Sequence, residues 1–295
     1  MKRLRWILVL LACWAWTGLV RADSLVLVHG YASSAATWDA SGVTAVLAQR
    51  GWQRGGLWRA TPRGPLWLPG PADPQAPRRY YLVDLPARAP LQWQANALGQ
   101  ALALLRAAHP EEPLILAGHS AGGVVARLVL LGGNPYRVDS LITIAAPHLG
   151  TIRAAEGLDL VDSKPFFCPG PGIDFLKTVL GGSGYRYLKH SRGLLLDLLP
   201  AGPGTLLYWA NHQPYPDIHY YSVIRENGFS LGDELVPAYS QDMNNVLTLH
   251  GHSVRLTTAS GHGLTPADGA LLADILDHRL AAASAGTRTE APGDE

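Results

Sequence analysis

The sequence predicts an α/β fold, in which a mostly parallel, doubly wound sheet carries helices on both faces. Short apolar runs, typical of buried parallel strands, alternate along the chain with segments of helical periodicity. Several of these runs end in glycine-containing turns, as expected where a strand is followed by a helix. With 295 residues, of which 47% are hydrophobic and 16% charged, the chain can bury the core that such a sheet needs.

The individual elements follow from these runs. The expected strands are continuous and apolar, and they are Ser24–Val28, Tyr80–Val83, Leu114–Ala117, Ser140–Ala145, His219–Ile224 and Val254–Thr258. The expected helices show apolar residues at helical spacing, and they are Thr44–Arg50, Gln94–Ala108, a segment directly after Ser120, and Pro266–Leu280. Proline, glycine and arginine dominate Thr61–Arg79, which predicts a long loop without regular structure.

The alternation of strands and helices is interrupted at about residues 151–217, where Gly- and Pro-rich turns, aromatic residues and an amphipathic stretch (Leu194–Leu199) occur. We therefore expect one domain over residues 23–282, with a cap or lid inserted at 151–217. The small and polar residues 283–295 predict a flexible tail.

The first segment has the pattern of a secretory signal peptide. Basic residues precede an apolar run from Trp6 to Val20, and small residues allow cleavage after Ala22. An uncleaved anchor is disfavoured because the run is short for a bilayer span, and lipoprotein cleavage before Cys13 is a minor alternative. The protein is thus expected to be exported, either to a bacterial periplasm or to the medium.

Loss of residues 1–22 changes the formal charge from +1 to −3, since this segment holds four basic residues and no acidic residue. A mildly acidic chain argues against nucleic acid as a partner.

The most informative motif is Gly118-His119-Ser120-Ala121-Gly122, which lies between a predicted strand and a predicted helix. It has the Gly-x-Ser-x-Gly pattern of a nucleophile elbow, in which glycines allow the strand and the helix to approach closely. Such a turn exposes the serine hydroxyl and directs the backbone N–H of the following residue toward developing charge. Ser120 is therefore the candidate nucleophile.

A serine hydroxyl needs a base within hydrogen-bond reach, and an elbow serine is followed along the chain first by an acid and then by a histidine. His262 is the predicted base because it follows the strand Val254–Thr258, whereas His250 and His252 precede that strand and His278 lies in a helix. Asp233 is the favoured acid, and Glu234 stays open as its rival because a shift in loop register would exchange the two.

The oxyanion formed on acyl attack needs two N–H donors, for which we predict the backbone groups of Ala121 and Tyr31. His29 precedes the serine and is predicted to be a structural hydrogen-bonding residue. Asp84, which follows an early strand, is predicted to brace a loop.

At these residues the chain resembles the α/β-hydrolase family, and within it the secreted bacterial lipases and esterases. The resemblance rests on Val26–Gly30, on Gly118–Gly123, on Ala145–Thr151, and on the Asp233 and His262 loops, and it spans about residues 24–280. It implies a Ser120–Asp233–His262 triad, an acyl-enzyme, no organic cofactor, and a lid over an acyl-chain groove. Residues 194–199 and 206–209 suit such a lid or acyl pocket, although ordinary core packing explains them as well.

Some members of the family bind a structural calcium near the histidine loop. Residues 261–268 hold no convincing cluster of acidic ligands, so no metal is expected.

The sequence therefore predicts a secreted serine hydrolase that cleaves lipid or acyl esters and makes transient contact with lipid surfaces. A thioesterase, amidase or acyltransferase on the same triad stays open because the motifs do not fix the leaving group. A non-catalytic lipid-binding or chaperone-like protein of the same fold is a rival from another class.

Overall fold

The computed structural model describes residues 22–162, 184–226 and 231–286. The predicted signal peptide therefore lies, except for Ala22, outside the described residues. Within the described part of the chain, no helix is both long enough and apolar enough to cross a bilayer.

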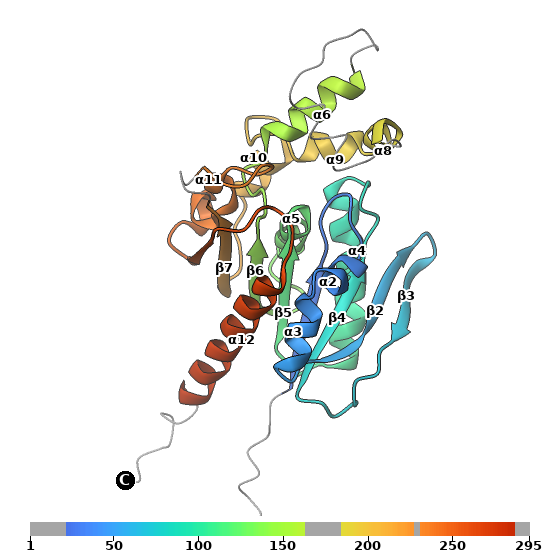
Figure 1. Ribbon diagram of the computed structural model, residues 1–295, viewed down its shortest axis with the longest axis vertical. Coiled ribbons are helices and arrows are strands. Elements are labelled where there is room, and N and C mark those ends of the chain that lie inside the picture. The colour runs from blue at the N-terminus through green and yellow to red at the C-terminus, as the bar shows by residue number, and fades with distance from the viewer. Residues whose placement is uncertain (1–21, 163–183, 227–230, 287–295) are drawn as a thin grey trace, which may run out of the picture.

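The core of the protein is an eight-stranded sheet in the order β3-β2-β4-β1-β5-β6-β7-β8 (Figure 1). Its strands are β1 Asp23–Val28, β2 Gln53–Thr61, β3 Gly64–Pro69, β4 Arg78–Asp84, β5 Leu114–His119, β6 Val138–Ile144, β7 His219–Arg225 and β8 Ser253–Thr258. Every pairing is parallel except that of β2 with β3. The predicted class, a mostly parallel α/β sheet, is confirmed.

Helices cover both faces of this sheet. The helices are α2 Ala36–Ala40, α3 Val43–Gln49, α4 Leu91–Ala108, α5 Ala121–Leu128, α6 Ile152–Asp162, α8 Gly184–His190, α9 Arg192–Asp197, α10 Leu206–Asn211, α11 Ala238–Gln241 and α12 Pro266–Gly286, with 3-10 turns η2 Met243–Asn245 and η3 Leu247–Leu249. Alternate residues of β1 enter opposite cores: Val26 and Val28 pack on the α4–α5 side, and Leu25 and Leu27 on the α3–α12 side. Burial on both faces explains why this strand is apolar throughout.

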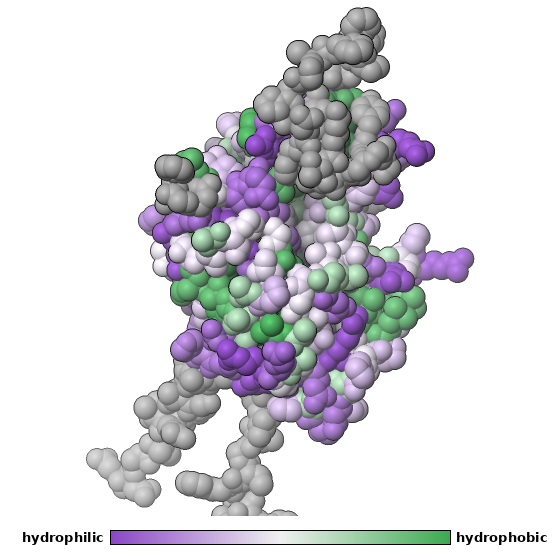
Figure 2. Space-filling model, viewed as in Figure 1, coloured by the Kyte–Doolittle hydropathy of each residue, from purple (hydrophilic) through white to green (hydrophobic). Residues whose placement is uncertain are grey.

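The prediction of an irregular loop over Thr61–Arg79 was wrong. Residues 64–69 form β3, which pairs with β2 in an antiparallel hairpin. Pro65 and Pro69 lack a backbone N–H, but β3 is an edge strand, where the absence of that donor is tolerated. Figure 2 shows a hydrophobic area at this hairpin, where the side chains of Leu66 and Leu68 are exposed.

The last helix is longer than expected. α12 continues from Pro266 to Gly286, so residues 283–286 of the predicted tail are helical. The remainder of that tail lies outside the described residues. α12 packs beside α3, where Arg50 forms ion pairs with Asp274 and Asp277.

Residues 151–217 contribute α6, α8, α9 and α10, which gather at the end of the sheet where the parallel strands finish (Figure 1). Leu194, Leu195 and Leu207 from these helices are buried in the α4–α5 core, whereas Tyr208 and Trp209 are exposed. The predicted insertion thus joins the core through one face and presents aromatic side chains on another. Residues 163–183 of it lie outside the described residues.

Candidate active site

Ser120 occupies a sharp and strained turn between β5 and α5. Its φ of 53° and ψ of −131° lie in a region that non-glycine residues rarely adopt. A Cβ on Gly118 would lie 2.5 Å from the Cα of Gly123, and one on Gly122 would lie 2.3 Å from the carbonyl oxygen of His29. Only glycine allows the strand, the helix and the neighbouring loop to pass so closely, so the motif has the elbow geometry that its glycines predict.

The structure brings the three predicted side chains together. His262, on the loop after β8, has its Nε2 2.8 Å from the Oγ of Ser120 and its Nδ1 2.9 Å from the Oδ2 of Asp233. A carboxylate only accepts hydrogen bonds, so Nδ1 carries the proton and Nε2 accepts from the serine hydroxyl. This arrangement leaves the imidazole able to remove a proton from Ser120.

Asp233 is held as an anion by its loop. Its Oδ1 accepts hydrogen bonds of 2.7 Å from the backbone N–H groups of both Leu235 and Val236, and Gln241 donates to its Oδ2 at 3.2 Å. Burial alone would raise the pKa of this carboxyl group, but the hydrogen bond and charge of His262, with the two backbone donors, bring the pKa below its ordinary value. Asp233 is therefore ionised at neutral pH.

Glu234, the rival acid, contacts the main chain of His262 and not its imidazole ring. Its Oε1 accepts from the backbone N–H of His262 at 3.3 Å, and its side chain is exposed. Asp233, whose side chain is fully buried, contacts the imidazole itself. The geometry therefore favours Asp233 as the group that orients the ring.

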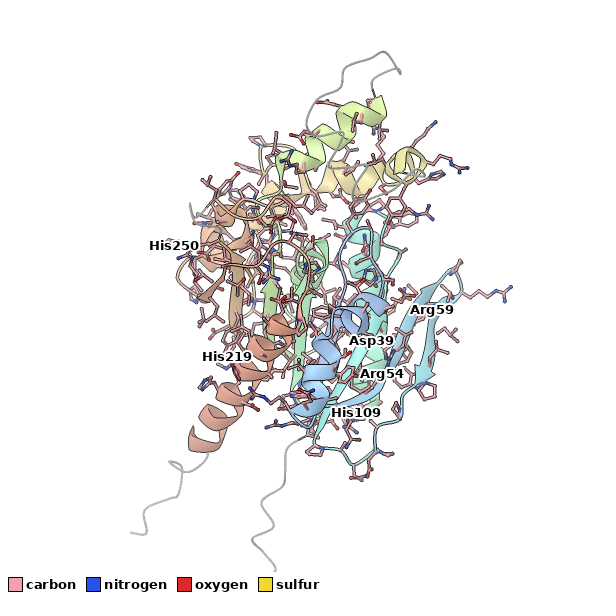
Figure 3. All side chains as sticks on the ribbon, in the orientation of Figure 1. Asp39, Arg54, Arg59, His109, His219 and His250 are labelled. Atoms are coloured by element: carbon pink, nitrogen blue, oxygen red, sulfur yellow. The ribbon has the colours of Figure 1, made fainter. Side chains whose placement is uncertain are left out.

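The other histidines and Asp84 lie in different surroundings. His29 donates from Nδ1 to the carbonyl of Gly30 and accepts the N–H of Leu85, as its predicted structural role requires. Asp84 accepts from the N–H of Ala35 and pairs with Arg59 of the hairpin, which Figure 3 shows at the outer side of the sheet. Figure 3 also shows His250 at the opposite edge of the molecule, where it bonds the carbonyl of Asn244 rather than the serine.

The two predicted oxyanion donors belong to chain segments that lie next to Ser120. Ala121 is the first residue of α5, and the chain at Gly30 is so close that a Cβ there would lie 2.8 Å from the Cβ of Ser120. Tyr31 follows directly. Neither the Ala121 N–H nor the Tyr31 N–H is committed to an acceptor among the described residues. Both N–H groups are thus available to an acceptor, as their predicted role requires.

A buried ion pair lies beneath the histidine loop. Arg225, at the end of β7, is 2.6 Å from Asp268 at the start of α12, and both side chains are almost completely buried. Arg225 also donates to the hydroxyl of Thr258, and Asp268 accepts from the N–H of Thr265. Together these bonds attach both ends of the loop that carries His262 to the sheet and to α12.

Sequence reasoning missed His119 and Gln241, which contact the predicted residues directly. Gln241 lies in α11, eight residues after Asp233, and an amide so placed gives no local signal. His119 stands within the elbow motif itself, but the pattern leaves that position unspecified. Its side chain is buried, and its Nε2 lies 2.8 Å from the carbonyl oxygen of His262.

Aromatic and apolar side chains surround this end of the sheet. Tyr31 packs against Tyr187 of α8 with ring centroids 5.5 Å apart. Exposed apolar side chains lie on α6, on the acid loop, on α11 and on α10, namely Ile152, Leu231, Tyr239 and Trp209. Within the described ranges, no group of three or more His, Cys, Asp or Glu side chains could hold a metal ion.

The comparison with protein families gives one match. Residues 90–160, which include the elbow and the Ala146–Gly150 segment, match a PGAP1-like alpha/beta domain. Among curated protein sequences, none is similar enough to this chain to be identified as a relative.

Solved structures share the fold at low identity. A lipase-esterase related protein from Clostridium acetobutylicum aligns with a TM-score of 0.53 and 11% identity, over 88% of this chain and 96% of that one. A putative cell surface hydrolase from Lactobacillus plantarum gives 0.50 and 16%, over 89% and 92%. The lipase BlEst2 of Bacillus licheniformis in its propeptide form gives 0.51 and 16%, over 84% and 48%. The chain has the α/β-hydrolase fold, and the resemblance seen in its sequence is confirmed at this level.

Proposed function

We propose that this α/β-hydrolase-fold protein is a serine hydrolase that cleaves carboxylic esters, with lipid or acyl esters as its substrates. The observation that carries the proposal is the chain of two hydrogen bonds from Ser120 through His262 to the buried Asp233. A serine is a poor nucleophile at neutral pH, and this arrangement provides both the base and the group that orients it.

In the proposed reaction the Oγ of Ser120 attacks the ester carbonyl carbon while His262 Nε2 takes the hydroxyl proton. Asp233 stabilises the imidazolium that forms and keeps its Nδ1–H directed inward. The tetrahedral intermediate collapses, the C–O bond to the alcohol breaks, and His262 gives its proton to the leaving oxygen. A water molecule, deprotonated by His262, then attacks the acyl-enzyme and releases the carboxylic acid.

Charge develops on the carbonyl oxygen during both attacks. The backbone N–H groups of Ala121 and Tyr31 stabilise it, and each such donor is worth roughly 3 kcal/mol of barrier. Because both donors belong to the main chain, no cofactor or metal ion is needed for this chemistry.

Two observations support an apolar acyl substrate. Exposed apolar side chains of Ile152, Leu231, Tyr239 and Trp209 lie at the end of the sheet that carries Ser120, and such a surface suits transient contact with a lipid aggregate. Two of the proteins that share the fold are described as a lipase and as a lipase-esterase related protein.

Export forms part of the same proposal. A signal peptide over residues 1–22 would deliver the mature chain to the periplasm or the medium, where extracellular lipid esters are available. Identifying the N-terminal residue of the protein recovered from these fractions tests this point: Asp23 is expected, and an intact Met1 would contradict it.

The activity is tested with a series of p-nitrophenyl esters of increasing acyl length. We expect hydrolysis by the wild type and none above background by Ser120→Ala. Ser41→Ala is the matched control, since Ser41 lies between α2 and α3 and bonds the carbonyl of Trp38. Full activity in Ser120→Ala would overturn the proposal. Turnover of thioesters or amides but not of esters would support Ser120 as the nucleophile and contradict esters as the substrate class.

A further inference from the structure

His119 joins the nucleophile turn to the histidine loop. It directly precedes Ser120 and its side chain is buried under the loop after β8. The imidazole of His119 lies with its centroid 5.2 Å from that of His262, but the polar contact runs from His119 Nε2 to the main-chain carbonyl of His262 at 2.8 Å. The mechanism proposed above does not use this side chain.

The hydrogen bond fixes the tautomer of His119. A carbonyl oxygen can only accept, so Nε2 must carry a proton. The other ring nitrogen, Nδ1, is buried and has no hydrogen-bond partner among the described atoms. A second proton on Nδ1 would therefore be placed without an acceptor, so the ring is a neutral donor.

Three charged or titratable groups lie around this ring, namely His262 on the loop above it and the Arg225–Asp268 ion pair from β7 and α12. His262 and Arg225 favour the neutral ring, and Asp268 opposes them. Burial, with the cationic form of His262 next in effect, lowers the pKa of His119 to about 3. His119 thus stays neutral even while His262 gains and loses a proton.

We propose that His119 is a positioning residue. It holds the main chain of His262 so that Nε2 of the His262 imidazole stays within hydrogen-bond reach of the Ser120 Oγ. The inference rests on the proposed function. The adjacent residues His119 and Ser120 each bond to His262, one at its carbonyl and one at its ring. The histidine is therefore attached at two points to one rigid dipeptide of the elbow.

The remaining polar atoms of His262 are also held. Its Nδ1 binds Asp233, and its backbone N–H binds the exposed Glu234 at a longer distance of 3.3 Å. Of the two main-chain contacts, the buried 2.8 Å bond from His119 is shorter and less accessible to competing water. Its loss frees the carbonyl end of His262, and displacement of a catalytic group by about 1 Å can reduce the rate by about a hundredfold.

The test compares His119→Leu, which removes the donor, with His119→Gln, whose side-chain amide can donate to the same carbonyl. We expect His119→Leu to lower kcat by about tenfold to a hundredfold with KM almost unchanged, and to slow fluorophosphonate labelling of Ser120 similarly. His119→Gln is expected to recover most of the wild-type kcat. A purely structural role would not separate kcat from KM or distinguish the two variants.

His148→Leu is the matched control, because His148 is another fully buried histidine and bonds Thr143 instead of His262. We expect it to lower the melting temperature and to leave the kcat of the folded protein near the wild-type value. Equal kcat in His119→Leu and the wild type, or equal losses in His119→Leu and His119→Gln, would overturn the inference. Absence of both hydrolysis and labelling in the wild type would instead overturn the proposed function.

Nitrogen-15 NMR of the histidine rings gives a readout that does not depend on turnover. His119 is expected to remain in the Nε2–H tautomer from neutral pH down to about pH 5, well above its lowered pKa. A protonated Nδ1 in that range would contradict the inference.

Discussion

Replacement of Asp233 by asparagine tests the geometry of the acid loop most sharply. The Oδ1 of Asp233 accepts two backbone N–H groups, from Leu235 and Val236, at 2.7 Å each. The amide oxygen of asparagine must take this place, since a reversed amide would leave two buried donors unpaired at about 1–3 kcal/mol each. The amide NH₂ then faces Nδ1 of His262 at the position that Oδ2 holds, 2.9 Å away.

An NH₂ group in that position donates to Nδ1, so the single proton of the neutral imidazole moves to Nε2. His262 would then present a donor to Ser120 and could not act as a base. For this change of tautomer we expect kcat to fall by about 10⁴-fold, which corresponds to about 5 kcal/mol of barrier. The loss should occur without a change of fold because the side-chain volume is preserved.

The assay is steady-state hydrolysis of a short-chain p-nitrophenyl ester at neutral pH, with circular dichroism to verify the fold. Glu234→Gln is measured in parallel. It keeps an oxygen acceptor for the backbone N–H of His262, so its kcat is expected to fall less than about tenfold. Retained activity in Asp233→Asn together with a large loss in Glu234→Gln would refute the assignment of the acid.

Three further predictions concern stability. A Cβ on Gly122 would lie 2.3 Å from the carbonyl oxygen of His29, which belongs to the main chain and cannot easily move away. We therefore expect Gly122→Ala to lower the free energy of unfolding by about 1–3 kcal/mol in a urea titration and to lower activity. An unchanged urea midpoint would contradict the close packing at the elbow. Asp268→Leu leaves the buried Arg225 without its anionic partner, so we expect the free energy of unfolding to fall by about 3–5 kcal/mol in the same assay. A fall of less than about 1 kcal/mol would contradict the burial of this ion pair. The pKa of His119 in the folded protein is about 3, which is below its pKa in the unfolded chain. The neutral ring therefore stabilises the fold fully at pH values above the unfolded-state pKa, and this stabilisation is lost as the pH falls. Between about pH 7.5 and about pH 5 this loss should reach about 2 kcal/mol, and the variant His119→Leu should show a correspondingly smaller change.

The elements that could be predicted from sequence are those with strong local signals. The β1 and β5 strands are buried on both faces and therefore read as continuous apolar runs, and the predicted ranges agree with them closely. The turn at Ser120 could be predicted because its glycines follow a short local pattern, although the close contact of Gly122 is with the distant main chain of His29. The loops of Asp233 and His262 could be predicted because an elbow serine is followed along the chain by an acid and then by a histidine, each after a later strand.

The β2–β3 hairpin could not be predicted because its strands are stabilised by their partners and not by their own pattern. Gly55 and Gly56 interrupt β2, where the register against β4 shifts, and Pro65 and Pro69 lie at the second and last positions of β3. Aromatic packing between Trp58 and Trp67, with ring centroids 4.7 Å apart, holds the two strands together across the turn.

The choice between Asp233 and Glu234 also required the structure. Both residues lie on one loop, and the tertiary contacts that turn Asp233 inward come from Gln241 and His262, which are distant in sequence. The contact between His119 and His262 was hidden for the same reason, because the two residues lie 143 positions apart.

Covalent labelling shows whether Ser120 is the nucleophile. The purified protein is incubated with a fluorophosphonate, and the modified peptide is identified by mass spectrometry in the wild type, in Ser120→Ala and in Asp233→Asn. We expect one equivalent of label on Ser120 in the wild type, none in Ser120→Ala, and much slower labelling in Asp233→Asn. No labelling of the folded wild type, or labelling that persists in Ser120→Ala, would contradict the assignment of Ser120 as the nucleophile.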